Sequence, residues 1–207
     1  MTFNPFQENT YVVWDDSKEC IIIDPGCYED DEKNILFEFI KTNNLRPVKL
    51  INTHCHIDHI LGNKFVIDKW QVNLYIHKSD MILLEESSNI AKSYGFNKYE
   101  CSPNPYNFLE EGNTLKFGNS NLLIYFTPGH SPGHICLYSE SEGFIISGDV
   151  LFNGSIGRTD LPGGDFETLI KSIKTKLLPL QDDTIVFCGH GPSTNIGKER
   201  NKNPFLQ

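Results

Sequence analysis

Four side chains that can bind metal ions lie within six consecutive positions of the sequence. They are His54, His56, Asp58 and His59, in the segment THCHIDH, which follows the apolar run VKLI. Because side chains two apart on an extended segment point to the same side, His54 and His56 face one point. Imidazole and carboxylate are ligands of zinc, iron and manganese, and this set excludes a thiolate-rich structural site. The cluster therefore predicts a metal centre rather than a solvated polar turn.

Further candidate ligands follow other apolar runs. His130 and His134 follow NLLIYF in the segment TPGHSPGH, Asp149 follows FIISG, and His190 follows TIVFCG. If these strand ends lie on one rim, their side chains gather with the first cluster. Both His130 and His134 come after a Pro-Gly turn, so the residues alone leave open which of them binds metal.

These segments, in their order along the chain, resemble the motifs of a known family. THCHIDH, TPGHSPGH, SGDVLF and FCGHG match, in sequence, the signature of the metallo-β-lactamase-fold superfamily. More narrowly, SGDVLFNGSIGRTDLPGGD and GHGPSTNIGKERNKNPF are similar to the small single-domain glyoxalase-II-like hydrolases, which act on hydroxyacylglutathione. The resemblance covers essentially the whole chain. It implies an α/β (α+β) fold of four αββα layers, in which two mixed sheets pack face to face and helices lie outside.

The resemblance also implies a site with two divalent metal ions, zinc in the first place, with iron or manganese as alternatives. The implied ligands are His54, His56 and His130 for one ion, Asp58, His59 and His190 for the second, and Asp149 as a bridge. The implied reaction is hydrolysis of an acyl thioester by a metal-bridged hydroxide, which Asp58 orients and from which it takes the proton. His134 and Asp24 then have supporting roles, and His77 is interpreted as structural.

Arg158, in GSIGRTDLPGG, has two alternative roles. Its segment is expected to be a loop leaving the metal rim, where a planar guanidinium can bind an anionic group of the substrate through two hydrogen bonds. Alternatively, Arg158 pairs with Asp160 or Asp165 and holds the loop.

Other functions stay open. A persulfide dioxygenase with one iron ion shares the fold and a similar Gly-Arg-Thr-Asp segment, and a metal-binding protein without catalysis is a third possibility. A β-lactamase is disfavoured, because many of those enzymes have cysteine at the position of Asp149 or lack a bridging carboxylate. Full-length glyoxalase II enzymes continue into a helical C-terminal domain with basic residues that bind glutathione. This chain ends soon after His190, so we expect no such domain and leave the thiol of the substrate open.

The composition of the chain limits its domain number, its partners and its cellular location. The 207 residues are expected to form a single domain, 1–207, and 39% of them are hydrophobic. The net charge of −9 disfavours nucleic acid and anionic lipid as partners. We expect a small-molecule substrate, no membrane span and no signal peptide. The six cysteines contain no C-x-x-C pair, which indicates reduced, mostly packed thiols in a cytoplasmic protein.

Alternation and helical periodicity predict the elements that position these residues. Residues 10–26 are expected to form a hairpin, followed by helix 31–44, strand 48–54, helix 59–70, strand 72–77 and a helical region over 78–100. In the second half, strands are expected at 114–117, 121–130, 134–139 and 144–150. There the amphipathic helix 165–178 should bury one face, and the last strand should cover 184–191. The residues of that face are Phe166, Leu169, Ile170, Ile173 and Leu177.

Overall fold

A five-stranded sheet forms the centre of the N-terminal part of the chain in the computed structural model, which describes residues 1–207. Its strands, in spatial order, are β3 (Tyr11–Trp14), β4 (Glu19–Ile23), β5 (Arg46–Ile51), β6 (Asn73–Ile76) and β7 (Asn107–Phe108). Strands β3 and β4 pair antiparallel, as the predicted hairpin requires. The pairs β4–β5, β5–β6 and β6–β7 are parallel. Parallel strands end at one edge, so the residues after β4, β5 and β6 share that edge.

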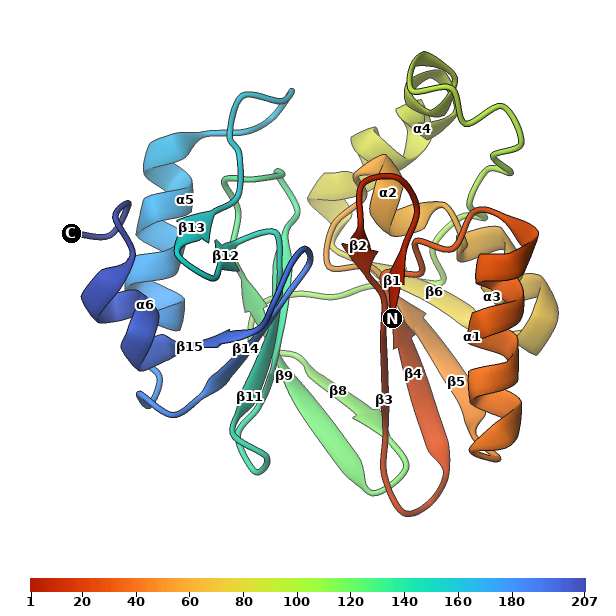
Figure 1. The fold of residues 1–207 in the computed structure, drawn as a ribbon, viewed down its shortest axis with the longest axis horizontal. Helices are drawn as coiled ribbons and strands as arrows, with labels where there is room; N and C mark the ends of the chain where they lie inside the picture. The colour runs from red at the N-terminus through yellow and green to blue at the C-terminus, as the bar shows by residue number, and fades with distance from the viewer. The chain divides into compact units, whose positions relative to one another are not determined.

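Helices α1 (Asp30–Thr42) and α3 (Asn63–Trp70) cover one face of this sheet, as Figure 1 shows. Helix α1 begins with a capping box, in which Glu29 and Glu32 each accept a backbone N–H of the first turn. Leu36 and Ile40 on α1 are buried in the core, and burial of such side chains contributes about 1.5–3 kcal/mol each. The helix predicted over residues 31–44 is confirmed. Beyond β6 follow a 3₁₀ turn (Lys78–Asp80) and α4 (Met81–Ser93).

The single helix predicted over 59–70 is wrong. The chain forms a short helix α2 (Ile57–Ile60) and then α3, with a break between them at Gly62. The Gly62 N–H donates to the carbonyl of Pro25 at 2.7 Å. A Cβ at position 62 would lie 2.5 Å from Cys27 Sγ. Only glycine therefore allows these two segments to approach each other this closely. This contact with the segment after β4 separates α2 from α3. The residues next to Gly62 in the sequence do not predict the contact.

A six-stranded mixed sheet forms the centre of the C-terminal part. Its strands, in spatial order, are β15 (Thr194–Asn195), β14 (Ile185–Cys188), β11 (Phe144–Gly148), β10 (Ile135–Ser139), β9 (Ser120–Phe126) and β8 (Thr114–Phe117). Strand β10 is antiparallel to both β9 and β11, and β11 is parallel to β14. Strands β9, β11 and β14 therefore run in the same direction and end at the same edge of the sheet. All the longer strands were predicted.

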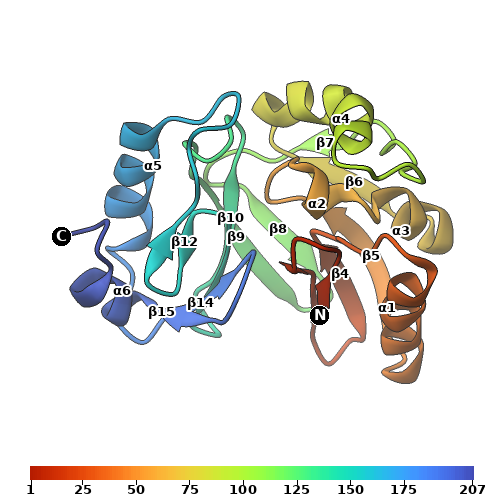
Figure 2. The same ribbon diagram turned by 45° about the horizontal axis from the view of Figure 1, so that its top comes forward.

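Helices α5 (Phe166–Ser172) and α6 (Ile196–Lys202) lie side by side on one face of this sheet (Figure 2). A π-helical turn (Ile173–Leu177) continues α5. Leu169, Ile173 and Leu177 are fully buried against the sheet, as predicted, but Phe166 is 46% exposed. Phe166 is the first residue of α5, and the prediction that it is buried with the rest of this face is wrong.

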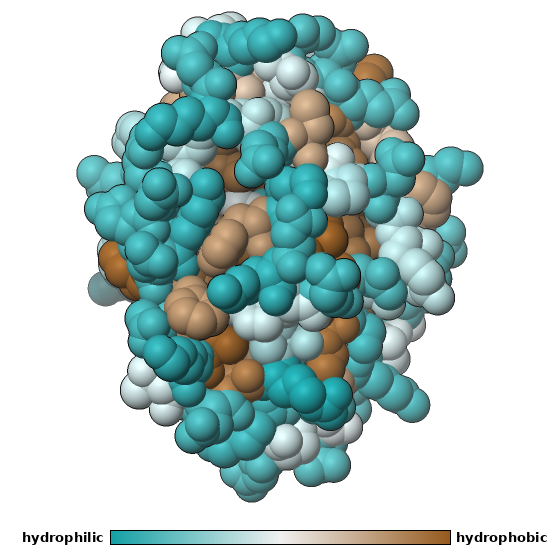
Figure 3. Space-filling view, turned by 90° about the vertical axis from the view of Figure 1, so that its right-hand side faces the viewer, coloured by the Kyte–Doolittle hydropathy of each residue, from teal (hydrophilic) through white to brown (hydrophobic).

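Two small hairpins complete the elements, and the sequence predicted neither. They are β1 (Thr2–Phe3) with β2 (Glu8–Asn9), and β12 (Leu151–Phe152) with β13 (Ser155–Ile156). The chain divides into two compact units: Met1–Phe108 with Lys116–Ser120, and Leu109–Leu115 with Asn121–Gln207. Mixed sheets with helices agree with the predicted α/β class. No helix is long and apolar enough to cross a membrane. Figure 3 shows mainly hydrophilic side chains on one side of the molecule, with small separate hydrophobic areas.

Candidate metal centre

The first unit gathers the THCHIDH side chains at the edge where β4 and β5 end. His54 follows β5, and Asp58 and His59 lie on α2. The ring centroid of His54 lies 4.1 Å from that of His59 and 4.8 Å from that of His56. The Nε2 atom of His59 lies 3.7 Å from Asp58 Oδ2. The structure therefore brings together all four residues that the sequence predicts as ligands in this unit.

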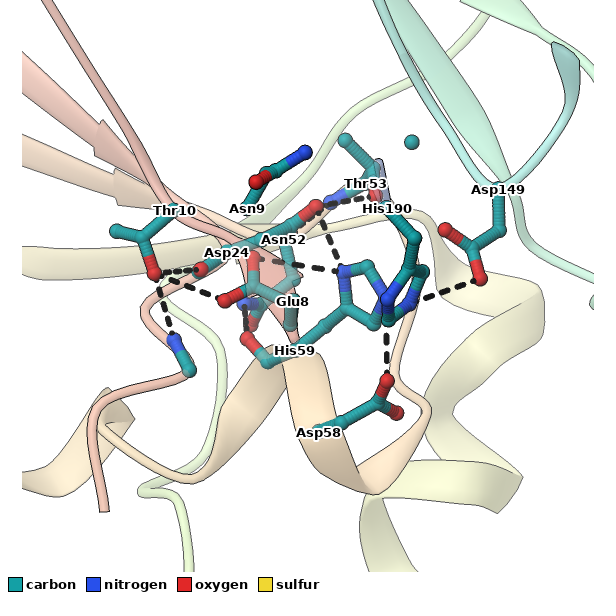
Figure 4. Close-up of polar contacts among 12 residues, drawn as sticks. Glu8, Asn9, Thr10, Asp24, Asn52, Thr53, Asp58, His59, Asp149 and His190 are labelled. Carbon is teal, nitrogen blue, oxygen red and sulfur yellow. Dashed lines mark hydrogen bonds and ion pairs between the residues drawn. The ribbon is translucent and has the colours of Figure 1, made fainter. Parts of the chain in front are cut away.

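Asp24 contacts Thr53 and His59 of this cluster, as Figure 4 shows. Its Oδ1 accepts the Thr53 N–H at 2.7 Å, and its Oδ2 accepts the Thr53 hydroxyl at 2.6 Å. The same Oδ2 lies 3.2 Å from His59 Nδ1. Asp24 has a φ of +48°, a left-handed conformation that few residues other than Gly, Asn and Asp adopt readily. Asp24 thus contacts both Thr53 and His59, and its supporting role stays a prediction. His54, His59 and Asp24 have donor atoms within 4.8 Å of one another.

These hydrogen bonds determine which nitrogen of each ring carries the proton. A carboxylate only accepts, so His59 Nδ1 is the protonated nitrogen and donates to Asp24. The Thr53 hydroxyl gives its proton to Asp24, so it accepts from His54 Nδ1 at 3.1 Å. In the neutral rings, the Nε2 atoms of His54 and His59 then carry the lone pairs. An imidazole that donates its other N–H to a carboxylate or hydroxyl is typical of metal-binding histidines.

Glu8 is a buried carboxyl group behind His59, and sequence reasoning missed it. It is fully buried, and its Oε1 lies 3.9 Å from His59 Nδ1. Burial raises the pKa of Glu8 well above its usual value, which the neighbouring His59 partly offsets. The Thr10 hydroxyl lies 2.9 Å from Glu8 Oε2 and 2.9 Å from the Asp24 carbonyl. Glu8 and Thr10 thus connect the β1–β2 hairpin to the turn after β4.

Buried polar side chains also fix the backbone of the THCHIDH segment. Asp80 Oδ2 accepts the Cys55 N–H at 2.8 Å, and Asn52 Nδ2 donates to the His59 carbonyl at 3.2 Å. Asn63 Nδ2 donates to Asn52 Oδ1 at 2.8 Å. Asn52, Asn63 and Asp80 were not predicted as part of the site. Single Asn and Asp residues carry no signal of their own in the sequence, and the contact of Asp80 with Cys55 depends on the fold.

The second unit gathers its predicted ligands at the ends of β9, β11 and β14. His130 follows β9, Asp149 follows β11, and His190 follows β14. Asp149 Oδ2 lies 3.5 Å from His130 Nε2 and 3.5 Å from His190 Nε2. His130 and Asp149 are buried, and His190 is partly exposed. One carboxylate oxygen thus lies near two imidazole nitrogens, and the bridging role of Asp149 stays a prediction.

The rings of His130 and His134 form different hydrogen bonds. His130 Nδ1 lies 2.7 Å from the carbonyl of Arg158, which can only accept, so Nδ1 carries the proton and Nε2 the lone pair. His134 Nε2 instead accepts the backbone N–H of Asp149 at 3.0 Å. The predicted supporting hydrogen bond of His134 is present, and that His130 rather than His134 binds metal stays a prediction. His134 fixes the backbone at Asp149.

Arg158 pairs with Asp160 in this structure. Its Nε and Nη2 donate to the two carboxylate oxygens of Asp160, both at 2.7 Å. This fork lowers the pKa of Asp160 from 3.8 to about 2. Asp165, the other predicted partner, instead accepts the Thr168 N–H and caps α5. A contact between Arg158 and substrate stays a prediction.

The remaining chemically active side chains have structural surroundings. His77 Nδ1 accepts the Ser79 N–H at the start of the 3₁₀ turn. Cys55 and Cys188 are buried, as predicted. Burial raises the pKa of Cys188 to about 12 and that of Cys55 well above its usual value. Neither thiol is a nucleophile at neutral pH.

The residues fit divalent metal ions. Each unit presents imidazole nitrogens beside a carboxylate, and three of the histidines hold the tautomer that ligation requires. These ligand types suit zinc, iron or manganese.

Comparison with known proteins agrees with this chemistry. The model of the metallo-beta-lactamase superfamily matches residues 3–190. The chain is 41% identical to hydroxyacylglutathione hydrolase GloC of Haemophilus influenzae over 206 residues, covering 97% of this chain and 93% of the relative. A solved structure of BLEG-1 B3 metallo-β-lactamase has a TM-score of 0.91 at 39% identity, covering 100% of this chain and 97% of the other. A solved di-iron-bound form of TTHA1623 has a TM-score of 0.89 at 38% identity, covering 100% and 98%.

These similarities confirm the predicted fold, since both solved structures match over the whole chain. The family match spans every candidate ligand from His54 to His190. The chain belongs to the metallo-β-lactamase superfamily and is a metal-dependent hydrolase.

Proposed function

We propose that this chain hydrolyses acyl thioesters of the hydroxyacylglutathione class. The geometry that carries the proposal is the Asp149 carboxylate, which lies 3.5 Å from the Nε2 atoms of both His130 and His190. That arrangement is suited to two ions that share one carboxylate. The substrate class rests on the 41% identity with a hydroxyacylglutathione hydrolase over 97% of the chain.

The proposal assigns ligands to two ions, zinc in the first place and iron as the alternative that the di-iron-bound relative favours. The assigned residues are His54, His56 and His130, then Asp58, His59 and His190, with Asp149 shared. The donor types and the tautomers of His54, His59 and His130 support this assignment. We also propose a cytoplasmic location, because all six cysteines are free thiols, and a small-molecule substrate, because the net charge of −9 disfavours nucleic acid.

The residues of the chain have separate tasks in this reaction. The bound ions supply a water of lowered pKa and an electrophile for the thioester carbonyl. Asp58 orients the attacking water and accepts its proton at a carboxylate oxygen. Asp24 and the Arg158 carbonyl keep two imidazoles in the ligating tautomer. A thiolate leaves without obligatory protonation, so a separate general acid is not required.

The test is a metal analysis paired with a substrate panel. Purified protein is loaded with zinc, iron or manganese, its metal content is measured, and hydrolysis of a hydroxyacyl thioester of glutathione is followed. We expect close to two metal equivalents per chain and thioester hydrolysis that disappears on chelation. A stoichiometry that never exceeds one would favour the single-iron dioxygenase instead, and a persulfide substrate in the panel tests that.

β-Lactam hydrolysis is a second candidate, because a B3 metallo-β-lactamase is 39% identical over the whole chain. The panel therefore includes a chromogenic cephalosporin. If kcat/KM for the cephalosporin exceeds that for the thioester, the thioester proposal is wrong. The same acyl group on a thiol other than glutathione shows whether the glutathione part is recognised.

A further inference from the structure

The loop between β13 and α5, residues 157–165, is closely bound to the segments that carry His130 and Asp149. The Gly157 N–H donates to the Val150 carbonyl at 3.3 Å, and the Asp165 N–H donates to the Gly129 carbonyl at 2.8 Å. The loop is thus fixed at both ends beside the two ligand-bearing turns.

Gly157 allows the loop to approach this closely. A Cβ at this position would lie 1.9 Å from the Asp149 carbonyl oxygen and 3.1 Å from His130 Nδ1. Any side chain here would displace the backbone of one candidate ligand and the ring of another. The contact therefore depends on glycine, and it brings the next residue, Arg158, to the ring of His130.

Arg158 contacts His130 through its main chain, whereas its side chain is directed to Asp160. Its carbonyl accepts from His130 Nδ1 at 2.7 Å. Its guanidinium forms a two-bond fork with Asp160, with both distances 2.7 Å. Both charged side chains are mostly exposed, at 60% and 67%. The fork joins residues two apart in sequence, so it restricts the peptide between them and with it the direction of the Arg158 carbonyl.

We propose that the Arg158–Asp160 pair is a positioning device for His130. It holds the Arg158 carbonyl against Nδ1, which keeps His130 in the tautomer and orientation whose Nε2 is directed to Asp149. Arg158 and Asp160 are then positioning residues that act through the main chain, not through substrate. The proposal rests on the proposed role of His130 as a metal ligand.

The first measurement uses metal-free protein and is independent of activity. Long-range ¹H–¹⁵N correlation reports which nitrogen of His130 is protonated, and exchange of the Nδ1 proton with water reports how firmly the carbonyl holds it. We expect a protonated Nδ1 and slow exchange in the wild type. Arg158→Ala and Asp160→Asn should each speed this exchange by about two- to fivefold, since loss of an exposed ion pair lowers the free energy of local opening only modestly.

The second measurement is zinc affinity by competition with a chromophoric chelator. Both variants keep the Arg158 carbonyl and break only the exposed fork, so we expect zinc affinity to fall by about two- to fivefold in Arg158→Ala and in Asp160→Asn. The double variant should be no weaker than either single one, because both changes break the same fork. Arg158→Lys should be intermediate, since an ammonium keeps the charge but not the fork.

A matched control is Lys176→Ala. Lys176 forms an exposed ion pair with Glu111 in the same unit, at 2.6 Å. Its removal should leave both readouts unchanged. If the Arg158 and Asp160 variants keep wild-type proton exchange and zinc affinity, the positioning role is wrong. A change in KM alone for Arg158→Ala, with Asp160→Asn unaffected, would instead support substrate binding.

The two proposals fail separately. A wild type that hydrolyses no thioester but shows the expected His130 exchange and zinc losses overturns the proposed substrate and leaves the positioning role standing. An active wild type whose Arg158 and Asp160 variants match it in both readouts overturns only the positioning role.

Discussion

The side chains at and near this site make different kinds of contact with their neighbours. Asp149 Oδ2 lies 3.5 Å from two imidazole nitrogens, whereas the His77 ring contacts the backbone of a 3₁₀ turn. Asp24 accepts three hydrogen bonds and also turns the chain. Substitutions at these three positions therefore separate ligation, support and local structure.

Asp149→Ala should lower metal content and activity together, because it removes a carboxylate that we assign to both ions. Activity should fall by more than the roughly 10–100-fold loss that follows removal of a hydrogen bond to a metal ligand. Elemental analysis and a thioester assay measure both effects. His77→Ala is the control and should keep both near the wild-type values; identical behaviour of the two variants would contradict the ligand assignment.

Asp24→Asn should weaken metal binding without disturbing the turn. Asparagine tolerates the φ of +48°, but its amide nitrogen cannot accept the His59 and Thr53 protons that Oδ2 accepts. We expect about 10–100-fold weaker zinc binding, measured by chelator competition. Wild-type affinity in this variant would show that the carboxylate does not support His59.

Elements with a clear period were predictable, and elements that depend on distant contacts were not. The hairpin β3–β4 and helix α1 follow from alternation and from apolar residues at helical spacing. Strands of two residues, as in the β1–β2 and β12–β13 hairpins, are too short to show a period. The break at Gly62 depends on the Pro25 carbonyl, which lies far away in sequence.

The candidate site was predictable to the same extent. Its donor residues follow strand ends, and that pattern is visible in the sequence. The roles of His130 and His134 depend on which partner each ring meets, the Arg158 carbonyl or the Asp149 N–H. Glu8 gave no signal, because an isolated glutamate normally lies at the surface, and only the fold places it beside His59.

Gly62→Ala should destabilise the junction of α2 and α3. The added Cβ would meet Cys27 Sγ at 2.5 Å and the Pro25 carbonyl oxygen at 2.8 Å. Overpacking of this kind costs about 1–3 kcal/mol in the free energy of unfolding, which urea denaturation measures. Cys27→Ala in the same chain should restore part of the loss, because it removes the sulfur but not the carbonyl. Full stability of Gly62→Ala would show that the close approach is not required.

Over the whole chain, burial determines which cysteines react. Five of the six thiols are buried, and Cys101 is exposed. Desolvation raises the pKa of Cys20, Cys27 and Cys136 to about 12, so these thiols stay protonated and unreactive at neutral pH.

Native protein should therefore react with a thiol reagent at Cys101 alone, and denatured protein at all six cysteines. Mass spectrometry of labelled peptides identifies the modified positions. Cys101→Ser should abolish native labelling without changing the thermal midpoint. Rapid native labelling of Cys20, Cys27 or Cys136 would contradict the burial described above.

Removal of metal should lower the thermal stability of the whole protein. Ions that bind only the folded chain stabilise it by about 2.7 kcal/mol at a free concentration of 100 Kd. For a chain of this size that corresponds to a rise in Tm of roughly 5–11 °C. Calorimetry before and after chelation measures the shift, and added zinc should reverse it. An unchanged Tm would indicate that no ion binds the native state.

The first unit is drawn from Met1–Phe108 and one later contribution, Lys116–Ser120. Chains leave the ribosome N-terminus first, at about 5–20 residues per second. The nascent chain therefore exposes His54, His56, Asp58 and His59 on the order of ten seconds before His190 is made. During that interval it carries only part of the proposed donor set. An ion bound to these four residues would therefore be captured before the set is complete, and without later exchange the supply of ions during synthesis would determine the final metal content.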